Sequence, residues 1–229
     1  MKKRPLIVVC LLIASFLVVT LATNCKKDDS NDPETVTDID GNIYKTVTIG
    51  TQVWMKENLR TSRYNNGDPI PEITDGAQWM NLSSGAYCNY DNNASYADTY
   101  GFLYNWYAVK DARNICPAGW HIPENDEWAT LIDFLGGEEV AGGKLKEKGT
   151  THWNSPNTDA NDTYGFRALP AGYRFGGSFY PPGYYAIWWS LTEKNNADAW
   201  IITLINTTSK SYLESSDKPG GLSIRCLKD

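Results

Sequence analysis

Hydrophobic and polar positions alternate most clearly over residues 43–49, where Ile43, Val47 and Ile49 share one side of an extended chain. Gly50 and Thr51 then interrupt the pattern, and a second short run follows at residues 52–55. Alternation on both sides of a tight turn is typical of a β-hairpin. We therefore expect the folded part of the chain to open with a hairpin.

The middle of the chain changes to a helical period. Trp128, Leu131, Ile132 and Leu135 follow Pro123 at helical spacing, and Gly136 comes directly after them. This pattern predicts a helix that ends at the glycine. A helix is also expected over residues 100–111 and a shorter one over 138–147, whereas residues 61–98 lack periodicity and are expected to form long, ordered loops.

After Trp153 the pattern indicates strands and turns. The predicted strands cover residues 166–169, 186–190, 200–205, 211–214 and 222–227. A hairpin, two or three helices and then several antiparallel strands is the order of an α+β fold and not of a βαβ fold. We find no repeat and no change of composition, so residues 37–229 are expected to form one domain.

The first residues have the organisation of a secretory signal. Lys2, Lys3 and Arg4 precede an apolar run over residues 6–22. A short polar exit, Thr23–Asn24–Cys25, follows this run. This arrangement resembles a bacterial lipoprotein signal and implies a signal peptide at 1–24, an acylated Cys25 and a flexible tether at 25–36. The polar, acidic stretch that follows resembles the surface-export signals of Bacteroidetes lipoproteins, so we expect a lipid-anchored protein of the outer membrane, exposed at the cell surface. An uncleaved anchor or an ordinary cysteine near a cleavage site are the alternatives.

Charge and cysteine content narrow the possible partners. The chain carries a net charge of −6, and removal of the basic signal would make it more acidic, which argues against nucleic acid as a partner. Cys88, Cys116 and Cys226 predict one disulfide and one odd thiol in an oxidising compartment. Zinc is not expected, because the chain has no C-x-x-C pair and only 2 histidines.

No catalytic arrangement stands out in the sequence. No Ser/His/Asp pattern is evident, and His121, which lies beside Trp120, is expected to be a hydrogen-bonded structural group. A cluster of oxygen-bearing side chains at Asn157, Asp159, Asn161 and Asp162 could in principle hold calcium. We favour a polar turn for this cluster, and we predict a protein that is not an enzyme and has no cofactor or metal.

Several ordered blocks carry a family resemblance. They are DGNIY at 40–44, QVWMKENL at 52–59, YGFLYNWYAV at 100–109, CPAGWHIP at 116–123 with EW at 127–128, ALPAGYR at 168–174, WWS at 188–190 and SIRC at 223–226. Together they closely resemble the Fibrobacter succinogenes major paralogous domain, over about residues 37–229. The motif order is also similar to the C-type-lectin-like fold, including the branch of the sulfatase-modifying factors. That resemblance implies a disulfide between Cys116 and Cys226; the alternatives are a pair that includes Cys88, or three free thiols.

An aromatic, glycine-rich stretch supplies the candidate ligand-binding residues. Nine Trp and 14 Tyr are the unusual feature of the composition, and they can form either an aromatic core or an exposed surface that stacks on sugars. The candidates are Tyr173, Arg174, Tyr180, Tyr185 and Trp189. Adjacent strand residues face opposite ways, so one of Trp188 and Trp189 is expected in the core and the other is available for a surface role or a second layer.

These features suggest a surface-tethered binding or adhesion lipoprotein that recognises polysaccharide or another cell-surface ligand. An envelope structural or assembly protein without a small ligand is the alternative. A divergent enzyme of the sulfatase-modifying branch would need a cysteine pair near the C-terminus, where only Cys226 lies.

Overall fold

The structure is a computed structural model that describes residues 34–229. The predicted signal peptide at 1–24, Cys25 and nearly all of the predicted tether at 25–36 lie outside these residues, so these predictions are not tested. Residues Pro33–Asp229 form one compact unit. Its first strand, β1 (Thr35–Thr37), pairs with the next one and thus begins slightly before the expected start of the domain. Within residues 34–229 no helix has the length and apolar character needed to cross a bilayer.

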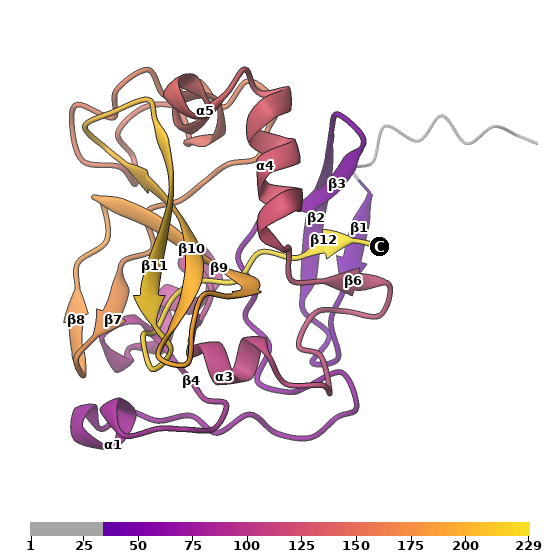
Figure 1. The fold of residues 1–229 in the computed structure, drawn as a ribbon, viewed down its shortest axis with the longest axis vertical. Coiled ribbons are helices and arrows are strands. Elements are labelled where there is room, and N and C mark those ends of the chain that lie inside the picture. Colours follow the sequence, from indigo (N-terminus) through magenta and orange to yellow (C-terminus); the bar gives the residue numbers. More distant parts are fainter. Residues whose placement is uncertain (1–33) are drawn as a thin grey trace, which may run out of the picture. The chain divides into compact units, whose positions relative to one another are not determined.

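A five-stranded antiparallel sheet contains both ends of this unit (Figure 1). The predicted hairpin is confirmed as β2 (Ile43–Ile49) and β3 (Gln52–Met55). The last strand, β12 (Leu227–Lys228), lies between β3 and β6 (Trp120–His121). The C-terminal residues therefore close the sheet that the N-terminal hairpin begins.

A second sheet has three antiparallel strands, with β10 in the centre. Its strands are β9 (Tyr185–Glu193), β10 (Asp198–Ile205) and β11 (Ser211–Asp217). Trp188 and Ile202 point to the side that helix α4 (Asn125–Phe134) covers, while Trp189 and Ile201 pack into a different core cluster on the opposite side. The mixed helix and strand content and the antiparallel sheets confirm the predicted α+β class.

Both adjacent tryptophans are buried, which corrects one expectation. Trp188 and Trp189 each have 0% exposed surface. They do face opposite ways, but the sheet is covered on both sides at this point, so neither ring reaches solvent. The prediction that one of them, Trp189, is available for a ligand was therefore wrong.

The predicted central helix is confirmed as α4 (Asn125–Phe134), which buries Trp128, Leu131 and Ile132. A reciprocal capping box between Glu124 and Glu127 satisfies backbone N–H groups in its first turn. Gly136 and the next glycine follow at φ values of 98° and 93°, which L side chains rarely adopt, and they end the helix. The shorter helix α5 (Glu138–Leu145) also lies where it was predicted.

The helix expected over residues 100–111 does not form as one element. The chain instead makes α2 (Ala97–Tyr100), β5 (Leu103–Tyr104) and α3 (Trp106–Val109). Gly101 causes the break, because its φ is 75° and a Cβ atom there would lie 2.7 Å from the Leu59 carbonyl oxygen. The expected loop region before it contains α1 (Gly76–Met80), β4 (Tyr87–Cys88) and two short 3₁₀ turns, η1 (Tyr90–Asn92) and η2 (Ala94–Tyr96).

The strands predicted at 166–169 and 222–227 form only isolated bridges, apart from Leu227, which belongs to β12. Ala168 pairs only with Lys146, and the segment before β12 makes isolated bridges from Leu222 to Tyr104 and from Ser223 to Trp188. Both segments run between larger elements and make backbone hydrogen bonds to several of them in turn, such as Leu59 N–H to the Ile224 carbonyl oxygen and Ala168 N–H to the Leu145 carbonyl oxygen, so no continuous ladder with one neighbouring strand forms. They are buried, as their apolar residues indicate, but they are not strands.

Tryptophan is mainly a core residue in this protein. Eight of the tryptophans in the described residues are buried: Trp54, Trp79, Trp106, Trp120, Trp128, Trp153, Trp188 and Trp189. By contrast, Tyr164, Tyr180 and Tyr184 are at least 37% exposed. The aromatic core and the aromatic surface that the composition suggested are thus both present: the tryptophans lie mainly in the core, whereas tyrosine occurs both in the core, as at Tyr44 and Tyr104, and at the surface.

The disulfide implied by the family resemblance is confirmed between Cys116 and Cys226. It joins residues 110 positions apart and ties the loop before β6 to the residue before β12. Cys88 is buried and forms no disulfide within the described residues.

We expect loss of this disulfide to destabilise the protein strongly. A cross-link that closes a loop of about 100 residues contributes on the order of 4–5 kcal/mol through the entropy of the unfolded chain. Urea unfolding of the double variant Cys116→Ser/Cys226→Ser should show a loss of at least about 2 kcal/mol, and addition of reductant should lower only the stability of the wild type. Equal stability of wild type and variant under oxidising conditions would contradict this.

His121 links the C-terminal residue to α4. One ring nitrogen lies 2.6 Å from Asp229 Oδ1 and the other 2.9 Å from Glu127 Oε1. Partial burial alone would lower the pKa of His121, but the hydrogen bonds to Asp229 and Glu127 outweigh it and raise the pKa. The expectation of a hydrogen-bonded structural histidine agrees with this arrangement.

The stability that His121 contributes should therefore depend on pH. Because the folded pKa is raised, this contribution is fully present below the unfolded value of about 6.5 and is lost as pH rises through the folded pKa. The difference in unfolding free energy between wild type and His121→Gln should shrink between pH 5.5 and pH 8.5. A difference that stays constant over this interval would show that the charged form of His121 gives no stabilisation.

Candidate functional site

The hairpin of β7 (Tyr173–Phe175) and β8 (Ser178–Tyr180) has two distinct faces. Strand alternation and the register place Tyr173 opposite Tyr180, and Phe175 opposite Ser178, on the outer face. The rings of Tyr173 and Tyr180 stack in parallel with centroids 4.6 Å apart. Phe175 is 47% exposed and Tyr180 is 40% exposed, so this face presents aromatic surface to solvent.

Arg174 lies on the inner face of the hairpin and is not available to a surface ligand. Its side chain is buried, with the guanidinium between the rings of Trp79 and Phe179. It donates hydrogen bonds of 2.8 Å to the carbonyl oxygens of Ile73 and Thr74. The prediction that Arg174 contacts the ligand was wrong, because strand alternation turns it inward, where it fixes the hairpin to the loop before α1.

A groove lies beside the outer face of this hairpin. Its volume is about 230 Å³, and strands β9, β10 and β11 form its floor. Tyr173 and Tyr185 line it together and meet edge to face with centroids 6.1 Å apart. We call this feature the tyrosine groove; it is lined by Tyr173, Phe175, Tyr185, Ile187, Ile201, Thr203, Glu214, Ser215, Ser216 and Leu222.

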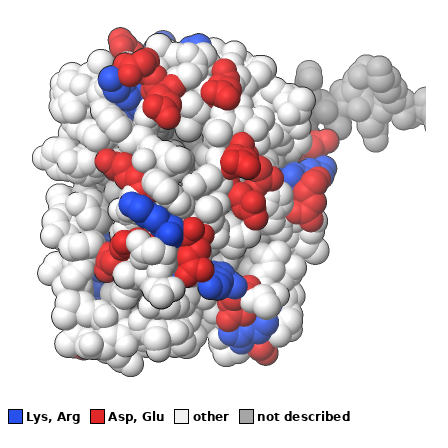
Figure 2. All heavy atoms as spheres, viewed as in Figure 1, with Lys and Arg blue, Asp and Glu red and all other residues white. Residues whose placement is uncertain are grey.

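The tyrosine groove is lined by aromatic and aliphatic side chains, with polar groups along one edge, and Glu214 is its one charged lining residue. Partial burial, followed by the neighbouring Tyr185 and Tyr180, raises the pKa of Tyr173, so its hydroxyl keeps its proton at neutral pH. The surface over β7 and β8 is largely uncharged, whereas acidic and basic groups are interspersed over the rest of the face shown (Figure 2). Glu214, Ser215 and Ser216 supply hydrogen-bonding groups on the β11 side. Such a groove can stack on flat faces and bind hydroxyl groups.

The site therefore includes three of the five residues predicted from the sequence. Tyr173 and Tyr185 line the groove, and Tyr180 extends its aromatic surface through the stack on Tyr173. Sequence patterns gave no signal for Glu214 and Ser216. These residues lie on β11, more than 25 positions after Tyr185, and only the pairing of β11 with β10 places them at the groove.

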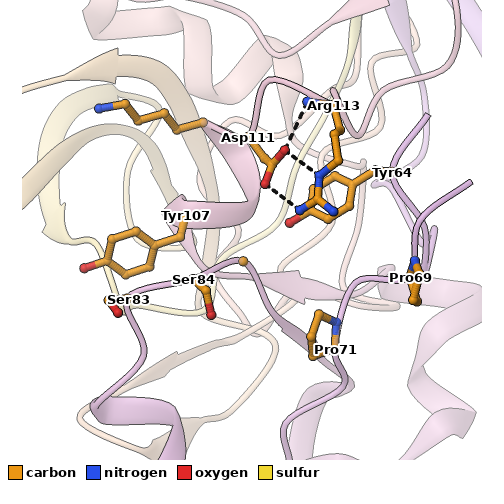
Figure 3. Close-up of a pocket in the computed structure, with 10 residues that line it drawn as sticks. Tyr64, Pro69, Pro71, Ser83, Ser84, Tyr107, Asp111 and Arg113 are labelled. Carbon is orange, nitrogen blue, oxygen red and sulfur yellow. Dashed lines mark hydrogen bonds and ion pairs between the residues drawn. The ribbon is translucent and has the colours of Figure 1, made fainter. Parts of the chain in front are cut away.

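A larger hollow of about 460 Å³ lies elsewhere in the unit, between the loop that contains Pro69 and Pro71 and the segment after α3 (Figure 3). The guanidinium of Arg113 lies 3.9 Å from the Tyr64 ring centre and forms a two-pronged ion pair with Asp111, at 2.8 and 2.7 Å.

The charged groups of this larger hollow are already paired. A further bond from Arg113 reaches Asp68 at 3.1 Å, and hydrogen bonds with Arg113 are the main cause of the lowered pKa of Asp111. Ser83, Ser84 and Tyr107 on the other side contribute hydroxyl groups (Figure 3). Of the two aromatic residues that line this hollow, Tyr64 is buried, whereas Phe175 in the tyrosine groove is 47% exposed.

The oxygen-rich cluster at residues 157–162 is a series of polar turns. Asn157, Asp159 and Asp162 have positive φ values between 44° and 54°, which Asn and Asp tolerate better than other residues. Asn161 Oδ1 accepts a hydrogen bond from the Thr163 N–H, and Asp162 Oδ1 accepts one from the Arg167 N–H. Among residues 34–229 no group of three or more His, Cys, Asp or Glu side chains is placed to hold a metal ion.

Comparison with known proteins gives one result. Neither the curated proteins nor the solved structures contain a significant match to this chain. The family model of the Fibrobacter succinogenes major domain matches residues 47–228, which is most of the 229-residue sequence. The chain therefore belongs to the Fibrobacter succinogenes major domain family.

Proposed function

We propose that this protein is a non-enzymatic binding module that recognises polysaccharide at the tyrosine groove. The observation that supports this most is the pair of stacked rings, Tyr173 and Tyr180, beside an open groove in the face of a rigid sheet. A sugar ring has flat apolar faces and a rim of hydroxyls, so it suits an aromatic surface edged by polar groups. The groove lies beside the exposed rings of Phe175 and Tyr180, which an extended chain at the surface can contact.

The groove is positioned by buried, well-packed elements. Its floor strands pack into the core on their opposite side, and Arg174 anchors the hairpin from beneath. The tyrosines therefore lose little conformational freedom when a ligand binds, which favours affinity.

A C-type-lectin-like architecture is part of the proposal. The supporting features are the antiparallel sheets, the helix after Pro123 and the disulfide that joins the loop before β6 to the residue before the last strand. In this protein the aromatic groove, and not the polar turns at 157–162, is the proposed sugar contact.

The proposed location is the outer face of the outer membrane, through a lipid on Cys25. The signal-like first 24 residues and the polar, acidic stretch after Cys25 support this. The long lipid chains would contribute on the order of 0.8 kcal/mol for each buried CH₂ group, which makes a durable tether. The acidic surface is a poor partner for anionic lipid, so the anchor would hold the protein.

An envelope structural protein is the second candidate. The burial of eight tryptophans favours it, because most of the aromatic residues then serve the core and not a ligand. The exposed tyrosines around the groove favour the binding module.

We expect residues 33–229 to be retarded in affinity electrophoresis by at least one plant or microbial polysaccharide. The double variant Tyr180→Ala/Tyr185→Ala should bind about tenfold more weakly or worse, because two aromatic contacts of roughly 0.5–1.5 kcal/mol each are removed. Retardation that survives in this variant would exclude the groove as the site.

The matched control is Tyr164→Ala/Tyr184→Ala, which removes two exposed tyrosines that do not line the groove. It should be retarded like the wild type, and all three proteins should unfold at similar temperatures. Absence of retardation with every polysaccharide in the panel would favour the structural alternative.

A further inference from the structure

Arg225 is a buried cation whose hydrogen-bonding capacity is only partly used. Its side chain is 1% exposed and lies between the rings of Phe166 and Trp188. Nη1 donates to the Phe166 carbonyl oxygen at 2.5 Å, and Nη2 donates to Asn58 Oδ1 at 2.7 Å. Both acceptors are neutral, and Nε has no partner among the described residues.

Two of the other buried cations in residues 34–229, Lys146 and Arg174, show what a full set of partners looks like; a third, Lys218, is ion-paired with Glu193. The Lys146 ammonium donates to three carbonyl oxygens at 2.7–3.0 Å. The Arg174 guanidinium has carbonyl partners on Nε, Nη1 and Nη2. Arg225 has fewer acceptors, although a buried, uncompensated charge costs several kcal/mol. Burial lowers its pKa to about 9, which reflects this cost.

Arg225 lines a polar pocket of about 320 Å³. Three further basic residues line the same pocket: Lys56, Arg60 and Arg167. The Lys56 ammonium makes no hydrogen bond or ion pair to another residue of the described part of the chain. A pocket of this size is at the lower end of the range for small-molecule sites.

The acidic groups at this pocket are mostly engaged with other partners. Glu57 accepts a hydrogen bond from the Lys45 N–H at 2.8 Å, and Asp98 lies on the exposed rim. Glu147 is bound by His152 and by Arg167. The gathering of basic side chains is notable in a chain with a net charge of −6.

We propose that this pocket binds the oxyanion of a small ligand, a carboxylate or a sulfate. The anion would accept hydrogen bonds from Lys56 and from the guanidinium groups that line the pocket, and charge-assisted bonds of this kind are roughly twice as strong as neutral ones. It would compensate the buried charge of Arg225, because the nearest carboxylates that favour this charge, those of Glu57 and Asp162, act on it without forming an ion pair. This site is separate from the tyrosine groove and does not depend on it.

Isothermal titration of residues 33–229 at low ionic strength tests this, with glucuronate, inorganic sulfate and glucose as probes. Glucuronate or sulfate should bind, glucose should not, and added salt should weaken binding. Binding of both anions would assign recognition to the oxyanion itself, and binding of glucuronate alone would assign it to a sugar carboxylate. Failure of both anions to bind would overturn the proposal.

Variants locate the site without disturbing the core. Lys56→Gln should weaken anion binding about tenfold, whereas Lys228→Gln, an equal charge change at an exposed position outside the pocket, should leave it unchanged. Equal effects of the two variants would show that only overall charge matters and would contradict the proposal. The variant Tyr180→Ala/Tyr185→Ala should bind the anion normally, so failure at the groove and failure at this pocket can be distinguished.

Discussion

The arrangement of the whole unit depends on one buried amide, that of Asn58. Its Oδ1 accepts hydrogen bonds from Arg225 at 2.7 Å and from the Trp188 indole N–H at 2.8 Å. Its Nδ2 donates to the Tyr100 carbonyl oxygen at 2.9 Å and to the Ser223 hydroxyl at 3.2 Å. One side chain near the N-terminal hairpin thus fixes segments from the middle and the end of the chain. Because a buried polar group without partners costs about 1–3 kcal/mol, these segments have a single favourable arrangement.

This constraint explains why the proposed binding surfaces lie where they do. The disulfide at Cys226 and the network around Arg225 hold the C-terminal segment inside the unit, so β12 can complete the first sheet and Trp188 can pack under α4. Eight tryptophans then lie in the core, and the exposed aromatic residues are tyrosines and phenylalanines, among them Phe175 and Tyr180 on the β7–β8 hairpin. Tyrosine suits that position, because its ring gives apolar contact while its hydroxyl stays in water.

Local patterns predicted the parts of the fold that depend on local chemistry. The sequence predicted the hairpin at 43–55, the helix after Pro123 and the glycine that ends it. Each of these elements is determined by local periodicity and turn residues. The break at Gly101 was not visible, since it follows from the close approach of Leu59, which is distant in sequence. The same limit applies to the site. Tyr173, Tyr180 and Tyr185 could be named from a glycine-rich aromatic stretch. The inward orientation of Arg174, the burial of Trp189 and the position of Glu214 at the groove could not, because they depend on which faces the tertiary fold covers.

Hydrogen–deuterium exchange of residues 33–229, with and without a mixture of soluble plant and microbial polysaccharides, tests the central claim most directly. If the tyrosine groove binds a polysaccharide chain, backbone amides over residues 173–185 and 211–217 should exchange more slowly when polysaccharide is present, while those around Pro69 and Arg113 should be unchanged. Protection confined to the hollow lined by Tyr64 and Arg113, or no protection anywhere, would contradict the claim.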